Sequence, residues 1–373
     1  MVLDWIGFCG GLLLLVVTWT SVIGTLVVPR HVDSRISRRT EWFLDRVFRL
    51  ATRRVQSYES RDRALAWQAP LGLLLRLAVW ILLLDLAFAL LMLPSHPHSL
   101  GDALAASSSS MFTLGYAAPH GFSGSLLEGL AAFTGLIVVG LQVGYLPVFY
   151  AAFNRRETEV SLLIARSGVP GWGPEILART KWGIYDGDTR PLLDELFTAW
   201  ERWASEVAES HTTYIALARF RSSRPWAHWL TSLIAVMDAA AVHLAVAPSL
   251  EPKLSARLCL RMGFETLGEI ARTARIPVPA EADPDAAISI SFEEFSAAVA
   301  NLDEVGYPIE RTAEEAWPHF RGLRANYDEA ACALAYLLDA PPTLWTGPRR
   351  WPSTPIPPKR PAARMPRTAS PSD

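Results

Sequence analysis

Long apolar runs alternate with charged stretches along the first 153 residues of the chain. Three of these runs are nearly free of charge: Trp5 to Val28, Leu71 to Leu93, and Leu126 to Phe153. Each is about 20 residues long or longer, which is the length that a helix needs to cross a hydrocarbon core of about 30 Å. The pattern therefore predicts three transmembrane helices.

The first apolar run has two interpretations, a cleaved signal peptide and a retained membrane helix. A signal peptide begins with a basic region, whereas Met1 to Trp5 contains Asp4 and neither lysine nor arginine. Arginines follow the run instead of preceding it. These features favour an N-terminal transmembrane helix over residues 1–29.

The linker between the first two runs, residues 30–70, is rich in arginine. Short loops rich in arginine stay on the cytoplasmic side, which predicts an external N-terminus and a cytoplasmic C-terminus. Apolar residues recur between the arginines at helical spacing: Trp42, Phe43, Val47, Phe48, Leu50, Ala51 and Val55. This pattern predicts an amphipathic helix whose apolar face contacts either the membrane surface or the cytoplasmic domain.

A short polar stretch between the second and third runs contains the most informative motif. Asp102 is a suitable N-cap for a short helix that begins at Ala103, and Thr-Leu-Gly-Tyr follows at residues 113–116. A span, a short helix, this string and a glycine-bearing span form the layout of the potassium-channel pore. Residues 71–153 therefore resemble the pore-loop family of potassium channels, preceded here by an extra transmembrane helix.

The resemblance implies an ion channel that transports cations through a homotetramer. In such a pore, rings of backbone carbonyls form a selectivity filter that replaces the hydration shell of potassium or another monovalent cation. The implied filter residues are Thr113, Leu114, Gly115, Tyr116 and Ala117. Ala117 stands where the family has a second glycine, and a left-handed conformation there would cost alanine about 1 kcal/mol or more. Strict potassium selectivity therefore does not follow from the resemblance.

The third run, which would be the inner helix of the pore, contains several glycines and one proline. Gly135, Gly140, Gly144 and Pro147 are candidates for a gate or hinge, because glycine lets a helix bend and proline kinks it. The alternative is that the glycines allow close helix packing.

Two ionisable residues in the second run are candidates for function, because charged groups are rare inside a span. Arg76 lies near the cytoplasmic end, where its side chain can extend to the surface. Asp85 lies near the middle, and we expect it to hydrogen-bond the serine run at residues 107–110 or to line a cavity.

Residues 154–345 show apolar positions at three- and four-residue steps and few alternating patterns. They predict an all-α cytoplasmic domain of about six helices, with a capping box at Ser291 and Glu294. The run Trp226 to Ala247 is long enough for a fourth span, but a central Asp238 would cost about 2.5 to 3.5 kcal/mol in a membrane. A buried helix is therefore predicted there, and the basic residues 346–373 predict a disordered tail.

Composition and charge exclude few classes of function. Half of the chain is hydrophobic and its formal net charge is −2, which gives no indication of a nucleic-acid partner. The three cysteines match no metal or redox spacing, and we find neither a nucleotide-binding fingerprint nor a catalytic constellation, so no enzyme activity and no resident cofactor or metal is expected. One weak candidate for a ligand or metal site consists of five polar residues: Glu206, Glu209, His211, Asp238 and His243.

The sequence thus predicts an all-α membrane protein with three transmembrane helices, a re-entrant pore helix and filter loop, and an all-α cytoplasmic domain. Its predicted location is the inner or plasma membrane, with membrane lipid and copies of itself as partners and an unknown cytoplasmic ligand. The predicted function is a tetrameric cation channel. The alternative is a non-conducting scaffold or sensor, derived from a pore, that acts through its helical domain.

Overall fold

The computed structural model describes residues 2–28, 34–95, 99–117, 121–181, 190–279, 283, 285–349 and 354–358. Within these residues the protein is all-helical and contains no strand. Contacts between Cα atoms divide the chain into two compact units. Unit 1 comprises Met1–Phe153 and Thr212–Phe220, and unit 2 comprises Asn154–His211 and Arg221–Asp373.

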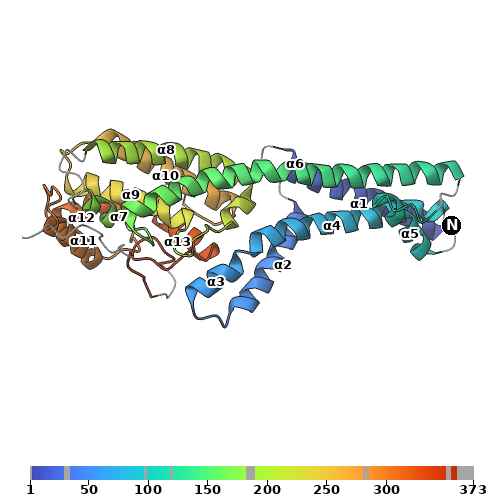
Figure 1. The fold of residues 1–373 in the computed structure, drawn as a ribbon, viewed down its shortest axis with the longest axis horizontal. Helices are drawn as coiled ribbons and strands as arrows, with labels where there is room; N and C mark the ends of the chain where they lie inside the picture. The colour runs from blue at the N-terminus through green and yellow to red at the C-terminus, as the bar shows by residue number, and fades with distance from the viewer. Residues whose placement is uncertain are drawn as a thin grey trace, which may run out of the picture. The chain divides into compact units, whose positions relative to one another are not determined.

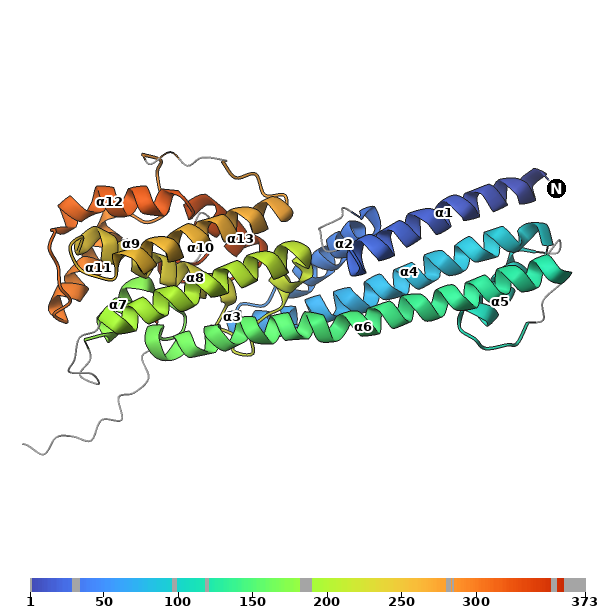
Figure 2. The same ribbon diagram turned by 90° about the horizontal axis from the view of Figure 1, so that it is seen from above.

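Unit 1 is built from long helices (Figure 1). Its elements are α1 (Val2–Leu26), α2 (Arg35–Thr52), α3 (Tyr58–Leu65), α4 (Gln68–Met92), η1 (Leu93–Ser95), α5 (Leu100–Met111), the first part of α6 (Gly121–Ser167), and η2 (Ile215–Arg219). The short helix α5 packs against α4, as both views show (Figures 1 and 2).

Four helical segments in the described part of the chain are long and apolar enough to cross a membrane. They are α1, the stretch of α3 and α4, α6, and α9 (Trp229–Val246). The first three coincide with the predicted spans. In α9, 17 of the 18 residues are buried inside the protein, which confirms the prediction of a buried helix.

Helices α1 and α4 pack closely because small and polar residues face each other. A Cβ atom on Gly11 would lie 2.7 Å from the backbone oxygen of Ala87, so only glycine fits at this crossing. Trp80 is fully buried, and its indole Nε1–H donates a hydrogen bond of 3.0 Å to the Ser21 hydroxyl. The contact therefore combines close backbone approach with a satisfied buried donor.

The N-terminus of α5 differs from the prediction. The helix begins at Leu100, and its N-cap is Ser99, whose hydroxyl accepts a hydrogen bond from the backbone N–H of Asp102. Asp102 therefore lies in the first turn, where its charge is favoured by the helix dipole. Its carboxylate accepts a hydrogen bond from Ser99 Oγ at 2.8 Å, so the prediction that Asp102 is the N-cap was wrong by one turn.

Helix α2 is amphipathic, as predicted, and several of its large apolar residues are exposed. Four large apolar side chains are exposed: Trp42, Phe43, Val47 and Leu50. The buried residues of the helix are Ser37, Thr40 and Thr52. Arg46 lies over the Trp42 ring at 5.3 Å, so apolar and cationic groups share the outer surface.

Unit 2 surrounds the apolar helix α9. Besides α9 and the end of α6, its described elements are α7 (Gly173–Arg179), α8 (Arg190–Thr213, whose last two residues belong to unit 1), α10 (Lys253–Thr273), α11 (Phe292–Glu304), α12 (Ala313–Ala325) and α13 (Asp328–Leu337). Helices α7, α10, α12 and α13 pack against α9, which explains its burial. The domain therefore has seven α-helices of its own where about six were expected.

The ends of the unit 2 elements follow ordinary capping chemistry. The capping box at Ser291 and Glu294 is confirmed at the start of α11.

The unit continues past Trp345, because Thr346 is fully buried and Arg349 Nη2 contacts the Glu294 carboxylate. The predicted tail therefore begins later than residue 346, and residues 359–373 lie outside the described part of the chain.

The contact at Gly11 gives a test of the α1 packing. We expect Gly11→Ala to lower the stability of the detergent-solubilised protein by about 1–3 kcal/mol, the usual cost of overpacking. The matched control is Gly10→Ala, because a Cβ on Gly10 meets nothing within 4 Å. Thermal unfolding of both variants checks the prediction, and equal melting temperatures would contradict it.

Candidate functional site

Three backbone amides of the loop after α5 converge on Ser109. The Ser109 carbonyl oxygen accepts hydrogen bonds from the N–H groups of Leu114 at 2.7 Å and Gly115 at 3.3 Å. The Ser109 hydroxyl accepts a third, from the N–H of Ala117 at 3.0 Å. The loop is therefore attached to the last turns of α5 through its donors.

This attachment fixes the direction of the loop's carbonyl groups. In a trans peptide the C=O of one residue points opposite to the N–H of the next. Because the amides of residues 114, 115 and 117 point at Ser109, the carbonyls of Thr113, Leu114 and Tyr116 point away from α5. The backbone twist that this requires is visible at Thr113 and Gly115, whose φ angles are 55° and 70°.

The backbone at Ala117 does not have the strain considered from sequence. Among the described residues, the non-glycine positions with positive φ are Thr113, Arg275 and Asp339. Ala117 is not one of them, so alanine there carries no left-handed penalty. The left-handed non-glycine residue in the loop is Thr113.

Asp85 anchors α5 to α4, which confirms the prediction made for it. Its carboxylate accepts hydrogen bonds from the hydroxyls of Ser107 at 2.7 Å and Ser108 at 2.9 Å. The Ser107 hydroxyl also lies 2.9 Å from the Asp85 backbone oxygen. This polar contact inside an apolar bundle fixes the rotation of α5 about its axis.

The four gate candidates on α6 have different surroundings. A Cβ on Gly135 would lie 2.4 Å from the backbone oxygen of Met111, at the end of α5. Gly140 and Gly144 have nothing within 4 Å of such a Cβ. Gly135 therefore serves close packing, whereas Gly140 and Gly144 face open space. Pro147 lies within α6, which runs unbroken from Gly121 to Ser167.

The loop and one side of α6 are uncovered in a single chain. Leu114 is 65% exposed and Tyr116 is 60% exposed. Large apolar residues of α6 are exposed as well: Phe122, Leu126, Leu130, Phe133, Leu136, Val139 and Val143. A polar solvent does not favour such a surface.

Arg76 does not extend to the surface, so that expectation was wrong. The residue is 5% exposed, its guanidinium lies over the Trp80 ring at 5.5 Å, and its Nη1 is 3.8 Å from Glu41 of α2. The side chain instead packs inside unit 1 between α2 and α4.

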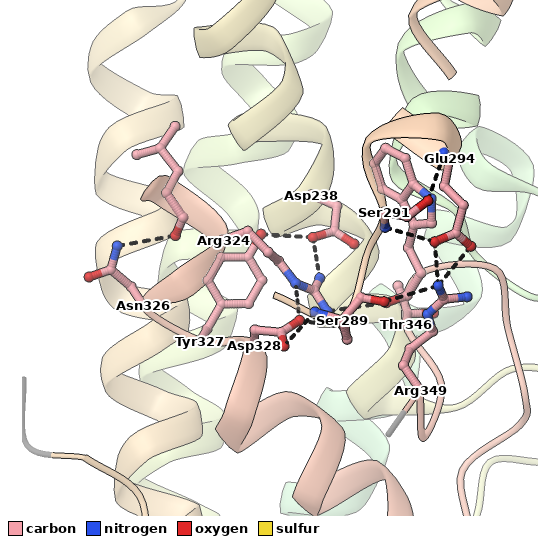
Figure 3. Close-up of polar contacts among 12 residues, drawn as sticks. Asp238, Ser289, Ser291, Glu294, Arg324, Asn326, Tyr327, Asp328, Thr346 and Arg349 are labelled. Atoms are coloured by element: carbon pink, nitrogen blue, oxygen red, sulfur yellow. Dashed lines mark hydrogen bonds and ion pairs between the residues drawn. The ribbon is translucent and has the colours of Figure 1, made fainter. Parts of the chain in front are cut away.

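A second polar site lies in the core of unit 2 (Figure 3). Arg324 of α12 is fully buried between two carboxylates. Its Nη1 donates to Asp238 Oδ1 at 2.5 Å and its Nε donates to Asp328 Oδ1 at 2.9 Å. The Tyr327 hydroxyl donates to the same Asp238 oxygen at 2.7 Å, while Asp238 Oδ2 has no hydrogen-bond partner.

The two carboxylates respond differently to this arginine. Burial raises the pKa of Asp238 to about 6, although Arg324 and Tyr327 act in the opposite direction. Burial alone would also raise the pKa of Asp328, but Arg324 and the hydrogen bonds from Ser289 outweigh it and lower that pKa. The difference arises because burial dominates at Asp238, whereas Asp328 also accepts hydrogen bonds from the side chain and backbone of Ser289.

The five polar residues proposed as a weak ligand or metal site do not come together. His211 Nε2 lies 3.1 Å from Arg156 Nη1, Asp238 binds Arg324, and His243 Nδ1 lies 2.7 Å from the Tyr307 hydroxyl. Within the described ranges, no group of three or more His, Cys, Asp or Glu residues is arranged to hold a metal ion. Ordinary buried partners therefore account for His211, Asp238 and His243, and Glu206 and Glu209 are exposed.

Sequence reasoning missed two residues on which these sites depend. Ser109 belongs to the serine run that we predicted only as a hydrogen-bond partner of Asp85. No motif in the neighbouring sequence indicated that Ser109 accepts hydrogen bonds from the loop. Arg324 is separated from Asp238 by 86 positions. The one available signal was that a buried aspartate requires a positive partner.

The contact of Asp85 with the serines predicts a measurable coupling. We expect Asp85→Ala to lower stability by about 1.5–3 kcal/mol, the value of hydrogen bonds to a charged group. In a double-mutant cycle with Ser107→Ala, the two effects should not add, because both changes remove the same contact. Thermal unfolding in detergent measures the cycle, and strictly additive effects would argue against the contact.

The raised pKa of Asp238 predicts a pH dependence of stability. A carboxyl that holds its proton more tightly when folded stabilises the protein at low pH, and this contribution is lost as pH rises through about 6. Asp238→Asn removes the titration but keeps a neutral side chain of similar shape. We therefore expect the melting temperature of the wild type, relative to that of Asp238→Asn, to rise as pH is lowered from about 7 to about 5.

Burial lowers the pKa of His211, His228 and His243, and these histidines also affect how stability depends on pH, but they are common to both proteins and cancel in this comparison. A difference in melting temperature that stays constant with pH would show that Asp238 keeps its charge throughout.

We compared the chain with models of known protein families, with curated proteins and with solved structures, and none matches. The functional argument therefore rests on the two sites described above. Of these, the α5 loop presents backbone groups at an uncovered surface, whereas the Arg324 site is closed within its own unit.

Proposed function

We propose that the protein is the subunit of a homotetrameric cation channel with a potassium-like pore. The observation that carries this proposal is the direction of the carbonyls of Thr113, Leu114 and Tyr116, away from α5 and toward an uncovered surface. Stacked rings of such carbonyls replace the hydration shell of a cation. The C-terminal end of α5, which carries a partial negative charge, lies directly before them and adds to the attraction.

One chain supplies one side of a ring, so the pore needs several copies. The exposed apolar residues of α6 and the exposed Leu114 and Tyr116 are the surface that neighbouring copies would cover. Four copies follow from the resemblance to the potassium-channel pore. In this arrangement the conducted cation is the ligand, at Thr113, Leu114, Gly115, Tyr116 and Ala117.

Ala117 is compatible with this filter. Its N–H binds the Ser109 hydroxyl at 3.0 Å and its backbone is not left-handed. The absence of a second glycine therefore does not prevent the loop from forming. We propose that the filter conducts monovalent cations and that residue 117 sets how strongly potassium is preferred.

The gate in this proposal lies on the cytoplasmic half of α6. Gly140 and Gly144 have no close neighbours in one chain, and Pro147 removes one helical hydrogen bond. Bending is least costly where contacts are few and a hydrogen bond is missing. Gly135 is excluded from the hinge because it is held against Met111.

The proposed topology has three spans, α1, α4 and α6, in the inner or plasma membrane. The arginine-rich linker is cytoplasmic, so the N-terminus is outside and unit 2 is inside. The exposed Trp42, Phe43, Val47 and Leu50 of α2, with the arginines between them, suit contact with the headgroups of anionic lipids. We do not count α9 as a span, because its surface is already covered by protein.

Cation flux into liposomes that contain the purified protein tests the proposal. We expect flux that prefers potassium over sodium and that is lost in Gly115→Asp, because an aspartate cannot easily adopt the backbone of Gly115 and would alter the ring charge. The matched control is Gly268→Asp in unit 2, where a Cβ meets nothing within 4 Å. Ala117→Gly should increase the preference for potassium.

Three other outcomes would change the conclusion. Equal flux of potassium and sodium would indicate a non-selective cation pore. Flux that survives Gly115→Asp would show that the loop is not the conduction path. The non-conducting scaffold would be supported if a verified tetramer shows no flux under any cation gradient and Ala117→Gly also shows none.

A further inference from the structure

One segment of the C-terminal half of the chain belongs to unit 1. Residues Thr212–Phe220, which we call the clasp, separate from unit 2 and pack with α2, α4 and α6. The clasp contains the end of α8 and the short helix η2. Leu217 at its centre is fully buried, so the segment is an integral part of the unit 1 core.

Both residues that flank the clasp are fixed in unit 2. His211, which precedes it, is fully buried and contacts Arg156 at 3.1 Å. Arg221, which follows it, donates through Nη2 to the backbone oxygens of Leu338 at 2.9 Å and Asp339 at 3.2 Å. A displacement of these anchors in unit 2 therefore pulls directly on the clasp, because only covalent bonds lie between.

The clasp holds α6 on both sides of Pro147 through aromatic contacts. The Tyr214 ring lies edge-on to Tyr145, with centroids 5.2 Å apart. The Phe220 ring lies 4.7 Å from Phe149 and 5.8 Å from Phe153. Such tilted and edge-to-face ring pairs stabilise a contact beyond the effect of the apolar area that they bury.

The clasp also binds α2 through one ion pair. Arg219 Nη2 lies 2.8 Å from Asp45 Oδ2, and the two side chains are 25% and 17% exposed. Beside the pair is a small pocket of about 30 Å³ that is lined by residues of α2, α4 and the clasp. Arg219 and Asp45 thus form a direct polar link between the clasp and α2.

We propose that the clasp is a brace through which unit 2 controls the pore: it holds α6 unbroken across Pro147, and its release lets α6 bend and increases conduction. Proline lacks the N–H that would complete the helix, so α6 is weakest at this point. The clasp contacts the turn before and the turn after it. Only the last step, increased conduction, rests on the proposed channel function.

A charge exchange tests the brace. Arg219→Glu and Asp45→Arg each replace the ion pair by a like-charge pair, and both residues are partly exposed, so neither change buries a new charge. We expect each single variant to raise cation flux by about fivefold, the lower range of couplings between sites. The double variant Arg219→Glu with Asp45→Arg restores opposite charges and should return flux to near the wild-type level.

Hydrogen exchange of α6 provides a readout that does not need conduction. The amides of residues 145–153 should exchange faster in each single variant and return to the wild-type rate in the double variant. The matched control is Arg202→Glu, which makes the same charge change at an exposed position of α8. It should alter neither flux nor exchange in α6.

The outcomes separate the brace from the channel function. No flux in any protein, together with the expected exchange pattern, would retain the brace and reject the channel. Normal flux in the wild type, with exchange and flux unchanged in the single charge variants and in Phe220→Ala, would reject the brace and retain the channel. Lower flux in the single variants would also overturn the proposal, because it would show that the contact favours the open pore.

A second pair of variants tests the aromatic contacts of the clasp, independently of the ion pair. Phe220→Ala removes the ring between Phe149 and Phe153, whereas Phe220→Leu keeps an apolar side chain there. We expect faster exchange at residues 145–153 in the alanine variant and a smaller effect in the leucine variant. Equal and wild-type exchange in both would overturn the brace even if the charge variants had an effect.

Discussion

The geometry of the α5 loop depends on the acceptors of a single residue, Ser109. Its carbonyl and its hydroxyl together receive three amides of the following segment. Where water is absent, backbone amides need protein groups as hydrogen-bond partners. Because these three N–H groups point at Ser109, the carbonyls in the same peptide planes point away from it. The hydrogen bonds that stabilise the loop therefore also orient its carbonyls.

The position of Ser109 is fixed by contacts further back in the chain. Asp85 of α4 binds the serines one and two positions before it, and the glycine backbone of α6 at residue 135 lies against the end of α5. The loop is thus supported by three helices. The core of unit 2 obeys the same rule, since Asp238 is tolerated in the apolar helix α9 because Arg324 and Tyr327 bind it. Helices α4 and α9 therefore each tolerate an aspartate because protein donors bind its carboxylate.

Much of this arrangement could be predicted from the sequence because it depends on local or strongly periodic signals. The long apolar helices, the capping box at Ser291 and the partner of Asp85 belong to this class. Errors arose where neighbouring residues offer equivalent chemistry. Ser99 and Asp102 are both good caps, and only the backbone shows that the serine is at the boundary. Arg76 has the length to reach the surface, but the Trp80 ring and Glu41 of α2 hold it inside.

Contacts between residues far apart in the chain could not be predicted from the sequence. The pairing of Arg324 with Asp238 and of Arg219 with Asp45 joins residues 86 and 174 positions apart. No spacing rule relates them, because each depends on how whole helices pack. The sequence around Tyr214 and Phe220 resembles any helix-ending loop, so its membership of unit 1 was not predictable.

The clasp has a consequence for how the protein is made. Chains emerge from the ribosome from the N-terminus, and domains generally fold as units during synthesis. Unit 1 cannot complete its folding when α6 emerges, because residues 212–220 of unit 1 are synthesised after residues 154–211 of unit 2. Helix α6 must wait, with Tyr145 and Phe149 uncovered, until α8 and the clasp have been synthesised. Assembly of the membrane part and folding of the helical part are therefore not independent events, and a chain that stops at residue 153 lacks a piece of its own core.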